Sequence, residues 1–414
     1  MNGLFEWTFD TDVKVVSVSE FDGTGEFSGI KAVTYDGAKL NGKKTKVFAY
    51  MGYPKDISGR IGAVVLVHGG GGVAYLPWVK MWNDSGYAAI AMSVTGDFPK
   101  VRNAGDDGSS FSEEKWHHGL YGDFAEQGYC DAPDNDRMRN SDAPINEQWM
   151  YHAVSQVIIA NNILRSDERI DKDKIGIMGI SWGGVITSIT IGYDNRFAFA
   201  IPVYGSGYLT ESMGNLGEFF RSGNNPDLWL AEKKFDEVNM PVLWMCKNDD
   251  IPFSLNSNSK SYIATRKRNS HTRISIPTPF RHNHSPVWER PEPVLFADSV
   301  VNDGSKFPEF VRKSNGWELH NPADLKITSL RICYLTEPML YQKDDNNDNV
   351  MVNKWQYKDI VNLEFSDEDI LPEGALEYYI EAEFDILGKK CIITSEFVGD
   401  DNCKHESINF CSEN

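Results

Sequence analysis

The sequence lacks the features by which a protein spans a membrane or binds a nucleic acid. No apolar run approaches the ~20 residues that a helix needs to cross a bilayer. The 41 Lys and Arg residues are outnumbered by 60 Asp and Glu, and the net charge of −19 disfavours contact with a phosphate backbone or an anionic membrane surface. We therefore expect no nucleic-acid partner and no membrane partner.

Cysteine is also scarce, and its spacing indicates neither disulfides nor a metal. The six cysteines form no C-x-x-C pair, so free thiols in a reducing compartment fit best. The amino terminus has neither the basic nor the apolar region of an export signal, and we expect a cytoplasmic protein. An acidic run at 344–349 resembles a calcium loop but has Trp355 where the bidentate Glu should stand. No metal and no other cofactor is predicted.

What is present is typical of a globular protein of more than one domain. The chain has 414 residues, of which 41% are hydrophobic, and this length exceeds that of one ordinary core. Short β-branched stretches in residues 1–55, at 13–18 and 45–50, predict strands that lead into or extend a larger sheet. Residues 56–304 alternate strand-like and helix-like segments. Residues 305–414 read as a C-terminal β-sandwich (immunoglobulin-like) domain, with strands predicted at 327–334, 360–365, 376–384 and 390–397.

The middle region carries apolar runs of strand length without polar alternation. Such runs are typical of parallel strands buried on both faces. They occupy 63–67, 88–92, 175–180, 197–203, 242–246 and 274–276. Apolar residues at helical spacing predict helices over 147–165 and 291–302. Strand and helix in alternation predict a doubly wound, mostly parallel α/β sheet.

One long segment, 97–146, shows no periodicity and is rich in Gly, Asp and Asn. A loop of this length inside a domain is usually functional, so it is interpreted either as a lid over a substrate or as a plain structural excursion.

A possible nucleophile follows the third of the long apolar runs. Gly179-Ile180-Ser181-Trp182-Gly183 has the Gly-x-Ser-x-Gly spacing of a strand-to-helix turn that exposes a serine hydroxyl. The two glycines are needed because the neighbouring backbone passes close to the turn on both sides. The pattern is short, and its significance depends on the residues that accompany it.

The supporting groups of a serine nucleophile are an acid, a base and oxyanion donors. An acid is expected after 242–246, where Asp249 is preferred and Asp250 is the alternative. A base is expected after 274–276, where His284 is preferred and His282 is the alternative. The acids could also simply begin a turn, and one of the histidines could be structural.

The backbone N–H groups of Trp182 and of Gly70 are the expected oxyanion donors. Gly70 lies in the glycine-rich loop 68–72, which has neither a Walker lysine nor a G-x-G-x-x-G pattern. Aromatic residues could offer a stacking face to a sugar or could be core residues; they are Trp116, Tyr204 and Trp288, with Trp78 and Trp182.

Together these motifs resemble the serine α/β-hydrolase superfamily, and more narrowly the bacterial acetylxylan-esterase and dienelactone-hydrolase-like group. The resemblance covers about 46–301 and depends on 64–72, 78–92, 179–184, 202–205 and 282–292. It implies an α/β-hydrolase fold with Ser181 as nucleophile, Asp249 as acid and His284 as base. True dienelactone hydrolases use cysteine as the nucleophile, so the serine disfavours lactone opening.

The resulting hypothesis is a carboxylic-ester hydrolase that removes small acyl groups, acetyl first, from a sugar or similar alcohol. Its partner would be a small-molecule or oligosaccharide ester. Whether the protein forms a homo-oligomer is left undecided by the sequence. A prolyl-oligopeptidase-like peptidase is the first alternative, although the residues before the hydrolase core are too few for a gating propeller. An inactive binding module is the second.

Overall fold

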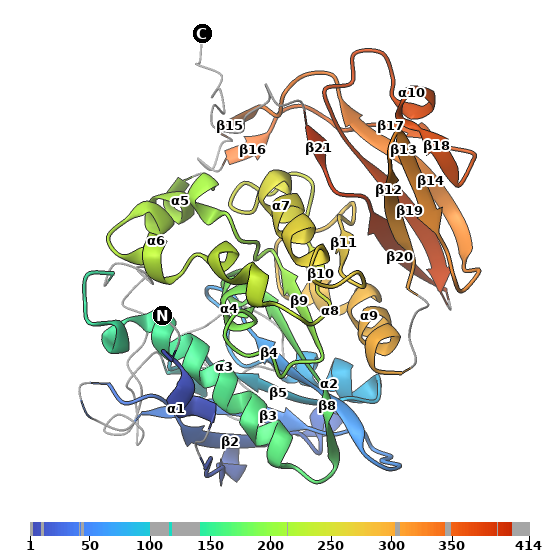
Figure 1. The fold of residues 1–414 in the computed structure, drawn as a ribbon. Helices are drawn as coiled ribbons and strands as arrows, with labels where there is room; N and C mark the ends of the chain where they lie inside the picture. The colour runs from blue at the N-terminus through green and yellow to red at the C-terminus, as the bar shows by residue number, and fades with distance from the viewer. Residues whose placement is uncertain are drawn as a thin grey trace.

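A nine-stranded mixed sheet forms the body of the protein (Figure 1). The computed structural model describes residues 3–399 except 10, 11, 41, 43, 44, 100–115, 118–140, 213, 303–306, 344–348 and 387. The sheet has the order β1-β2-β3-β5-β4-β8-β9-β10-β11. Its strands are β1 (Val16–Ser17), β2 (Lys31–Asp36), β3 (Lys46–Gly52), β4 (Ile61–Val67), β5 (Ala88–Met92), β8 (Ile170–Ile180), β9 (Phe199–Val203), β10 (Leu243–Met245) and β11 (Arg273–Ser275).

The six strands from β5 to β11 are mutually parallel, whereas β1, β2, β3 and β5 pair antiparallel. Each parallel strand falls on one of the six apolar runs, so that prediction is confirmed. Every residue of β5 and β9 is buried, as expected where helices cover both faces. The amino-terminal strands extend the same sheet, but β2 was not predicted. This order and strand direction are those of the α/β-hydrolase fold.

Helices α2, α3, α4, α7 and α9 pack on this sheet. Their bounds are α2 (Leu76–Asp84), α3 (Trp149–Ser166), α4 (Trp182–Thr190), α7 (Leu255–Arg266) and α9 (Glu292–Val301). The shorter helices are α1 (Glu6–Phe9), α5 (Gly214–Arg221), α6 (Asn225–Leu228), α8 (Ser285–Trp288) and α10 (Asp367–Ile370). The predicted helices at 147–165 and 291–302 correspond to α3 and α9. No helix in the described ranges has both the length and the apolar character needed to span a bilayer.

Helix α3 is buried on nearly all sides because the amino-terminal segment covers its outer face. The ring of Phe5 stacks on that of Tyr151 with 5.3 Å between centroids. The indole Nε1 of Trp7, in α1, donates to the Tyr151 hydroxyl at 2.6 Å. Polar groups on this face are paired with the cover, since Nδ2 of Asn162 also donates to the carbonyl of Thr8 at 2.5 Å. The even burial explains the mixed apolar spacing of the helix sequence.

Two further antiparallel sheets form the C-terminal β-sandwich (Figure 1). One has the order β12-β13-β18, with β12 (Glu309–Lys313), β13 (Gly316–His320) and β18 (Glu364–Ser366). The other contains β17 (Gln356–Asp359), β14 (Lys326–Leu335), β19 (Glu377–Ile386), β20 (Lys389–Thr394) and β21 (Val398–Gly399). Two small ribbons pair β15 (Tyr341–Lys343) with β16 (Asn349–Met351), and β6 (Phe98–Pro99) with β7 (Trp116–His117).

Three of the four strands predicted in this region are confirmed as β14, β19 and β20. The fourth, predicted over 360–365, is wrong in its first part, because β17 ends at Asp359 and β18 begins at Glu364. Most of the lid expected at 97–146 lies outside the described residues. The division of the chain into domains at residues 55 and 304 stays a prediction.

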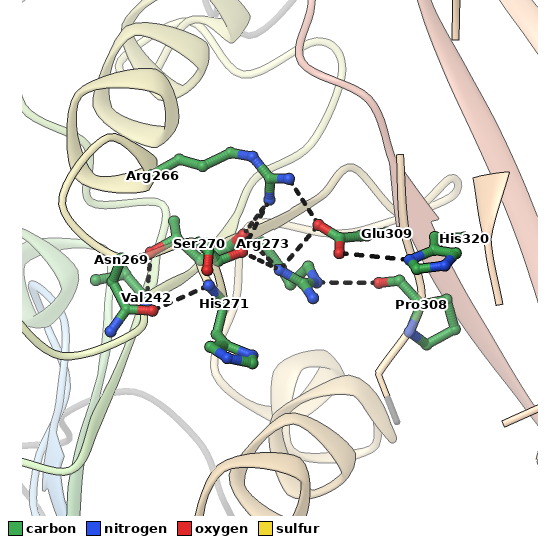
Figure 2. Close-up of polar contacts among 10 residues, drawn as sticks. Val242, Arg266, Asn269, Ser270, His271, Arg273, Pro308, Glu309 and His320 are labelled. Carbon is green, nitrogen blue, oxygen red and sulfur yellow. Dashed lines mark hydrogen bonds and ion pairs between the residues drawn. The ribbon is translucent and has the colours of Figure 1, made fainter. Parts of the chain in front are cut away.

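Buried ion pairs join the sandwich to the hydrolase sheet. Glu309, in β12, lies 2.6 Å from the guanidinium of Arg266 and 3.3 Å from that of Arg273 (Figure 2). Arg273 begins β11, so this junction fixes β12 beside the edge of the large sheet. A second junction is made by Glu292, whose carboxylate is fully buried, pairs with Arg290 and accepts the N–H of Ile392 at 2.7 Å.

Substitution of Glu292 by leucine is expected to destabilise the protein strongly. The change leaves the mostly buried Arg290 guanidinium and the Ile392 N–H without their acceptor. Loss of one partner of a buried ion pair costs about 3 kcal/mol or more. Urea unfolding should show this loss for Glu292→Leu, while Glu289→Gln, at an exposed position beside the same helix, should match the parent. Equal stability of Glu292→Leu and the parent would contradict this account of the junction.

Candidate active site

Ser181 occupies a strained turn between β8 and α4. Its backbone has φ 57° and ψ −120°, a conformation that non-glycine residues rarely adopt. The turn is held by its own N–H, which donates to the carbonyl of Val203 at 2.8 Å, and by its carbonyl, which accepts from the N–H of Val185 at 2.9 Å. The side chain is thereby lifted to the carboxyl edge of the sheet, where it is half-buried.

The two glycines of the motif are required by close backbone contacts. A Cβ on Gly179 would lie 2.0 Å from the carbonyl oxygen of Gly183. A Cβ on Gly183 would lie 1.9 Å from the carbonyl oxygen of Val67. The steric interpretation of the Gly-x-Ser-x-Gly pattern is therefore confirmed.

An imidazole and a carboxylate lie in line with the serine hydroxyl. Nε2 of His282 lies 2.8 Å from Oγ of Ser181, and Nδ1 of the same ring lies 2.7 Å from Oδ2 of Asp250. The carboxylate of Asp250 is buried, and its Oδ1 accepts the N–H of Phe253 at 3.1 Å. The half-buried ring of His282 thus lies between the hydroxyl of Ser181 and the buried carboxylate of Asp250.

The contacts that lead from the Ser181 hydroxyl are made by the two alternatives and not by the two preferred supporting residues. The side chain of Asp249 is 47% exposed and forms an ion pair with Lys247 at 3.1 Å. His284 is buried, and its Nε2 accepts the N–H of Gly69 at 2.9 Å. The alternatives, Asp250 and His282, occupy the positions that had been expected for these two. Residues one or two apart in a turn point in different directions, which the sequence pattern does not encode.

The glycine-rich loop after β4 packs directly against the serine turn. A Cβ on Gly69 would lie 3.0 Å from Cβ of Ser181, so only glycine allows this approach. Gly70 is exposed, whereas the N–H of Gly69 is occupied by His284. Trp182 is the first residue of α4, where N–H groups have no acceptor within their own helix. Gly70, in the loop after β4, and Trp182, at the start of α4, thus belong to the two segments that meet at Ser181.

Burial keeps the ring of His284 neutral, and this state allows its contact with the glycine-rich loop 68–72. Burial, with smaller contributions from His68 and His282, lowers the pKa of His284 to about 3. The neutral ring can accept the Gly69 N–H through Nε2. His68 fixes the same loop from the other side, since its Nε2 accepts the N–H of Val94 at 3.1 Å. The loop-fixing role expected of His68 agrees with this contact.

One protein family is similar to part of the chain. The prolyl oligopeptidase family model matches residues 142–240, less than half of the chain. The matched segment includes the turn at Ser181 and ends before Asp250 and His282. A comparison with curated protein sequences finds no match.

Among solved structures, the chain is similar to an acetyl xylan esterase from Paenibacillus sp. R4, at 17% identity over 70% of this chain and 89% of that one, with a TM-score of 0.47. It is similar to the Pyrococcus horikoshii acylaminoacyl peptidase at 16% identity over 63% of this chain, with a TM-score of 0.44. It is also similar to a Mycobacterium tuberculosis puromycin-hydrolyzing peptidase at 16% identity over 67%, with a TM-score of 0.47. The chain spans 40% of the length of each of these two peptidases.

The aromatic residues that were expected to contact substrate differ from one another in their exposure to solvent. Tyr204 has no exposed surface and cannot offer a face to a sugar, so that expectation is wrong. Its ring instead stacks on that of His282, with 4.3 Å between centroids and 12° between planes. Its hydroxyl donates to the carbonyl of Arg281 at 2.9 Å, which fixes the loop that carries the histidine.

Trp288 is half-buried and packs edge-on against Tyr75, with 5.5 Å between centroids. The side chain of Trp116 lies outside the described residues. Trp78 is a core residue of the hydrolase without exposed surface. No group of three metal-ligating side chains gathers anywhere in the part of the chain that the structure describes.

Replacement of His284 by glutamine should flatten the pH dependence of stability. Below the ordinary histidine pKa of about 6.5 the unfolded chain takes up a proton at this position, whereas the native ring does not do so until pH about 3. The free energy of unfolding therefore falls as pH decreases, by up to about 1.4 kcal/mol per pH unit from this one group. Urea unfolding between pH 6.5 and 4 should give a shallower decline for His284→Gln than for the parent. Parallel declines would show that His284 is protonated in the native state.

Proposed function

We propose that this protein is a serine carboxylic-ester hydrolase that works through an acyl-enzyme. The observation that carries the proposal is the continuous chain from Ser181 Oγ through the His282 ring to Asp250, with contacts of 2.8 and 2.7 Å. In this assignment Ser181 is the nucleophile, His282 the general base and acid, and Asp250 the group that holds the imidazole in the reactive tautomer.

The two halves of the reaction use the same groups. Oγ of Ser181 forms a bond to the ester carbonyl carbon while its proton passes to Nε2 of His282. The tetrahedral intermediate collapses when the carbon–oxygen bond of the alcohol breaks and Nε2 returns the proton to the leaving oxygen. Water then attacks the acyl-serine with His282 again as base, which releases the acid and restores the serine.

The negative oxygen of the intermediate would be stabilised by the N–H groups of Gly70 and Trp182. Trp182 directly follows Ser181, and Gly70 lies in the glycine-rich loop that packs against the serine turn, which supports this role. One such donor is typically worth about 3 kcal/mol of transition-state stabilisation. Because the N–H of Gly69 already donates to His284, the exposed Gly70 is the better candidate of the two loop amides.

We assign the substrate as an ester of a small acyl group, acetyl first, with a carbohydrate as the alcohol. This assignment is supported by the resemblance of motifs 64–72, 179–184 and 282–292 to acetylxylan-esterase-like hydrolases. A second candidate is a peptidase, because the prolyl oligopeptidase family model matches residues 142–240. An ester substrate needs less leaving-group activation than an amide, so activity on both classes should be compared directly.

Substitutions at the triad should separate the catalytic residues from their neighbours. We expect His282→Ala and Asp250→Asn each to lower kcat by about 10⁴-fold, because the base or its correct tautomer is lost. The matched control Asp249→Asn should keep kcat within about threefold, since its partner is Lys247. Hydrolysis of p-nitrophenyl acetate measures all three. Loss of activity in Asp249→Asn but not in Asp250→Asn would reverse the assignment of the acid.

Labelling and substrate preference should decide the reaction class. The parent is expected to react with a fluorophosphonate probe and to hydrolyse p-nitrophenyl acetate, while Ser181→Ala should do neither. We expect acetylated xylo-oligosaccharides to be hydrolysed with a higher kcat/KM than a prolyl p-nitroanilide. The opposite preference would indicate the peptidase. No labelling of folded parent protein would indicate a binding module without hydrolytic activity.

A further inference from the structure

Two aromatic side chains of the C-terminal sandwich contact the loop that carries the triad acid. The indole Nε1 of Trp355 donates to the carbonyl of Asn248 at 3.2 Å. The amide Nδ2 of Asn248 donates to the hydroxyl of Tyr379 at 3.2 Å. Asn248 stands two positions before Asp250 and is 92% buried by these contacts and their surroundings. The backbone and the side chain of one loop residue are therefore both held by the sandwich.

The two aromatic rings support each other. Trp355 precedes β17 and Tyr379 lies in β19, and their rings meet edge to face with 5.1 Å between centroids. Tyr379 is fully buried, and burial raises its pKa well above the ordinary value for tyrosine. Its hydroxyl thus stays neutral and can accept one hydrogen bond while it donates another.

The same hydroxyl also reaches the loop that carries the base. The hydroxyls of Tyr379 and Thr278 lie 3.5 Å apart, and Thr278 lies within the segment that leads from β11 to His282. One phenol oxygen of the sandwich therefore touches both loops whose side chains must meet in the Asp250–His282 hydrogen bond. The other support of the acid comes from within its own loop, where the Phe253 N–H donates to Asp250.

We propose that Tyr379 is a positioning residue for the triad, acting on Asp250 through Asn248 and on His282 through Thr278, with Trp355 as its support. On this account the C-terminal sandwich helps to set the geometry of the active site, in addition to covering the large sheet. The proposal rests on the function proposed above. Reacting groups must be held within a fraction of an ångström, so a loosened acid loop lowers the rate of the chemical step without altering substrate contacts.

The first experiment compares Tyr379→Phe with the parent on p-nitrophenyl acetate. The substitution keeps the ring and removes the hydroxyl that joins the two loops. We expect kcat to fall about 10-fold with KM unchanged within about twofold, because the acid and base lose alignment while the substrate site does not. Fluorophosphonate titration of active sites corrects each rate for unfolded protein. Trp355→Phe, which removes the indole donor at a half-buried position, should lower kcat in the same direction and provides the test if Tyr379→Phe does not fold.

Glu309→Gln is the matched control at the same junction. Glu309 pairs with Arg266 and Arg273 (Figure 2). Arg273 begins β11, whereas the segment that leads to His282 follows the other end of this strand. This variant should lose stability yet keep kcat per titrated site within about twofold of the parent. If it lowers kcat as much as Tyr379→Phe does, a general loosening of the junction explains both effects and the proposal is overturned.

A double-mutant cycle distinguishes positioning of the acid from any other effect. In an Asp250→Asn background, Tyr379→Phe should change kcat by less than about twofold, because the contact that it aligns is already impaired. A full 10-fold effect in that background, or no effect in the parent, would overturn the proposal. Ser181→Ala separates this outcome from failure of the proposed function: if that variant keeps the esterase activity, the triad itself is misassigned.

Discussion

The site depends on one geometric constraint, which is that parallel strands end at the same edge of a sheet. β4, β8, β10 and β11 are all parallel, and the loops that follow them carry Gly70, Ser181, Asp250 and His282 in that order. These four residues lie far apart in the sequence, and only the fold brings them to one edge of the sheet. The strain at Ser181 is tolerated because backbone hydrogen bonds to Val203 and Val185 fix the turn on both sides.

The two histidines of one loop, His282 and His284, make different contacts in the site. His282 faces the serine and keeps part of its surface exposed, whereas His284 is buried and holds the glycine-rich loop through Gly69. A buried ring that must accept a backbone N–H has to stay uncharged, and its low pKa meets this need. The buried ring of Tyr204 stacks on the ring of His282 and supports it from the interior of the protein. A single short segment thus carries both His282, which contacts the Ser181 hydroxyl, and His284, which contacts the glycine-rich loop.

The parts of this site that follow from backbone patterns could be predicted from the sequence, and those that depend on side-chain direction could not. Continuous apolar runs identify buried parallel strands, and glycine spacing identifies the turn at Ser181. Whether Asp249 or Asp250 faces the base depends on the local turn conformation, which neighbouring polar residues do not reveal. Strand β2 escaped prediction because Lys31–Asp36 mixes polar and apolar residues and contains no continuous apolar run. Tyr379 could not have been found at all, because its partner Asn248 lies 131 positions away.

The sandwich also changes the character of the last strand of the large sheet. β11 ends the strand order and would otherwise present unpaired backbone groups to any passing chain. Instead β20 packs on it, with the Ser275 hydroxyl donating to the carbonyl of Ile392 and the Thr394 hydroxyl donating to that of Ile274. Without the sandwich, β11 would be an uncovered edge strand, of the kind that can pair with another chain. The contact with β20 therefore gives the sandwich a second consequence for the large sheet, which is that its last strand is covered.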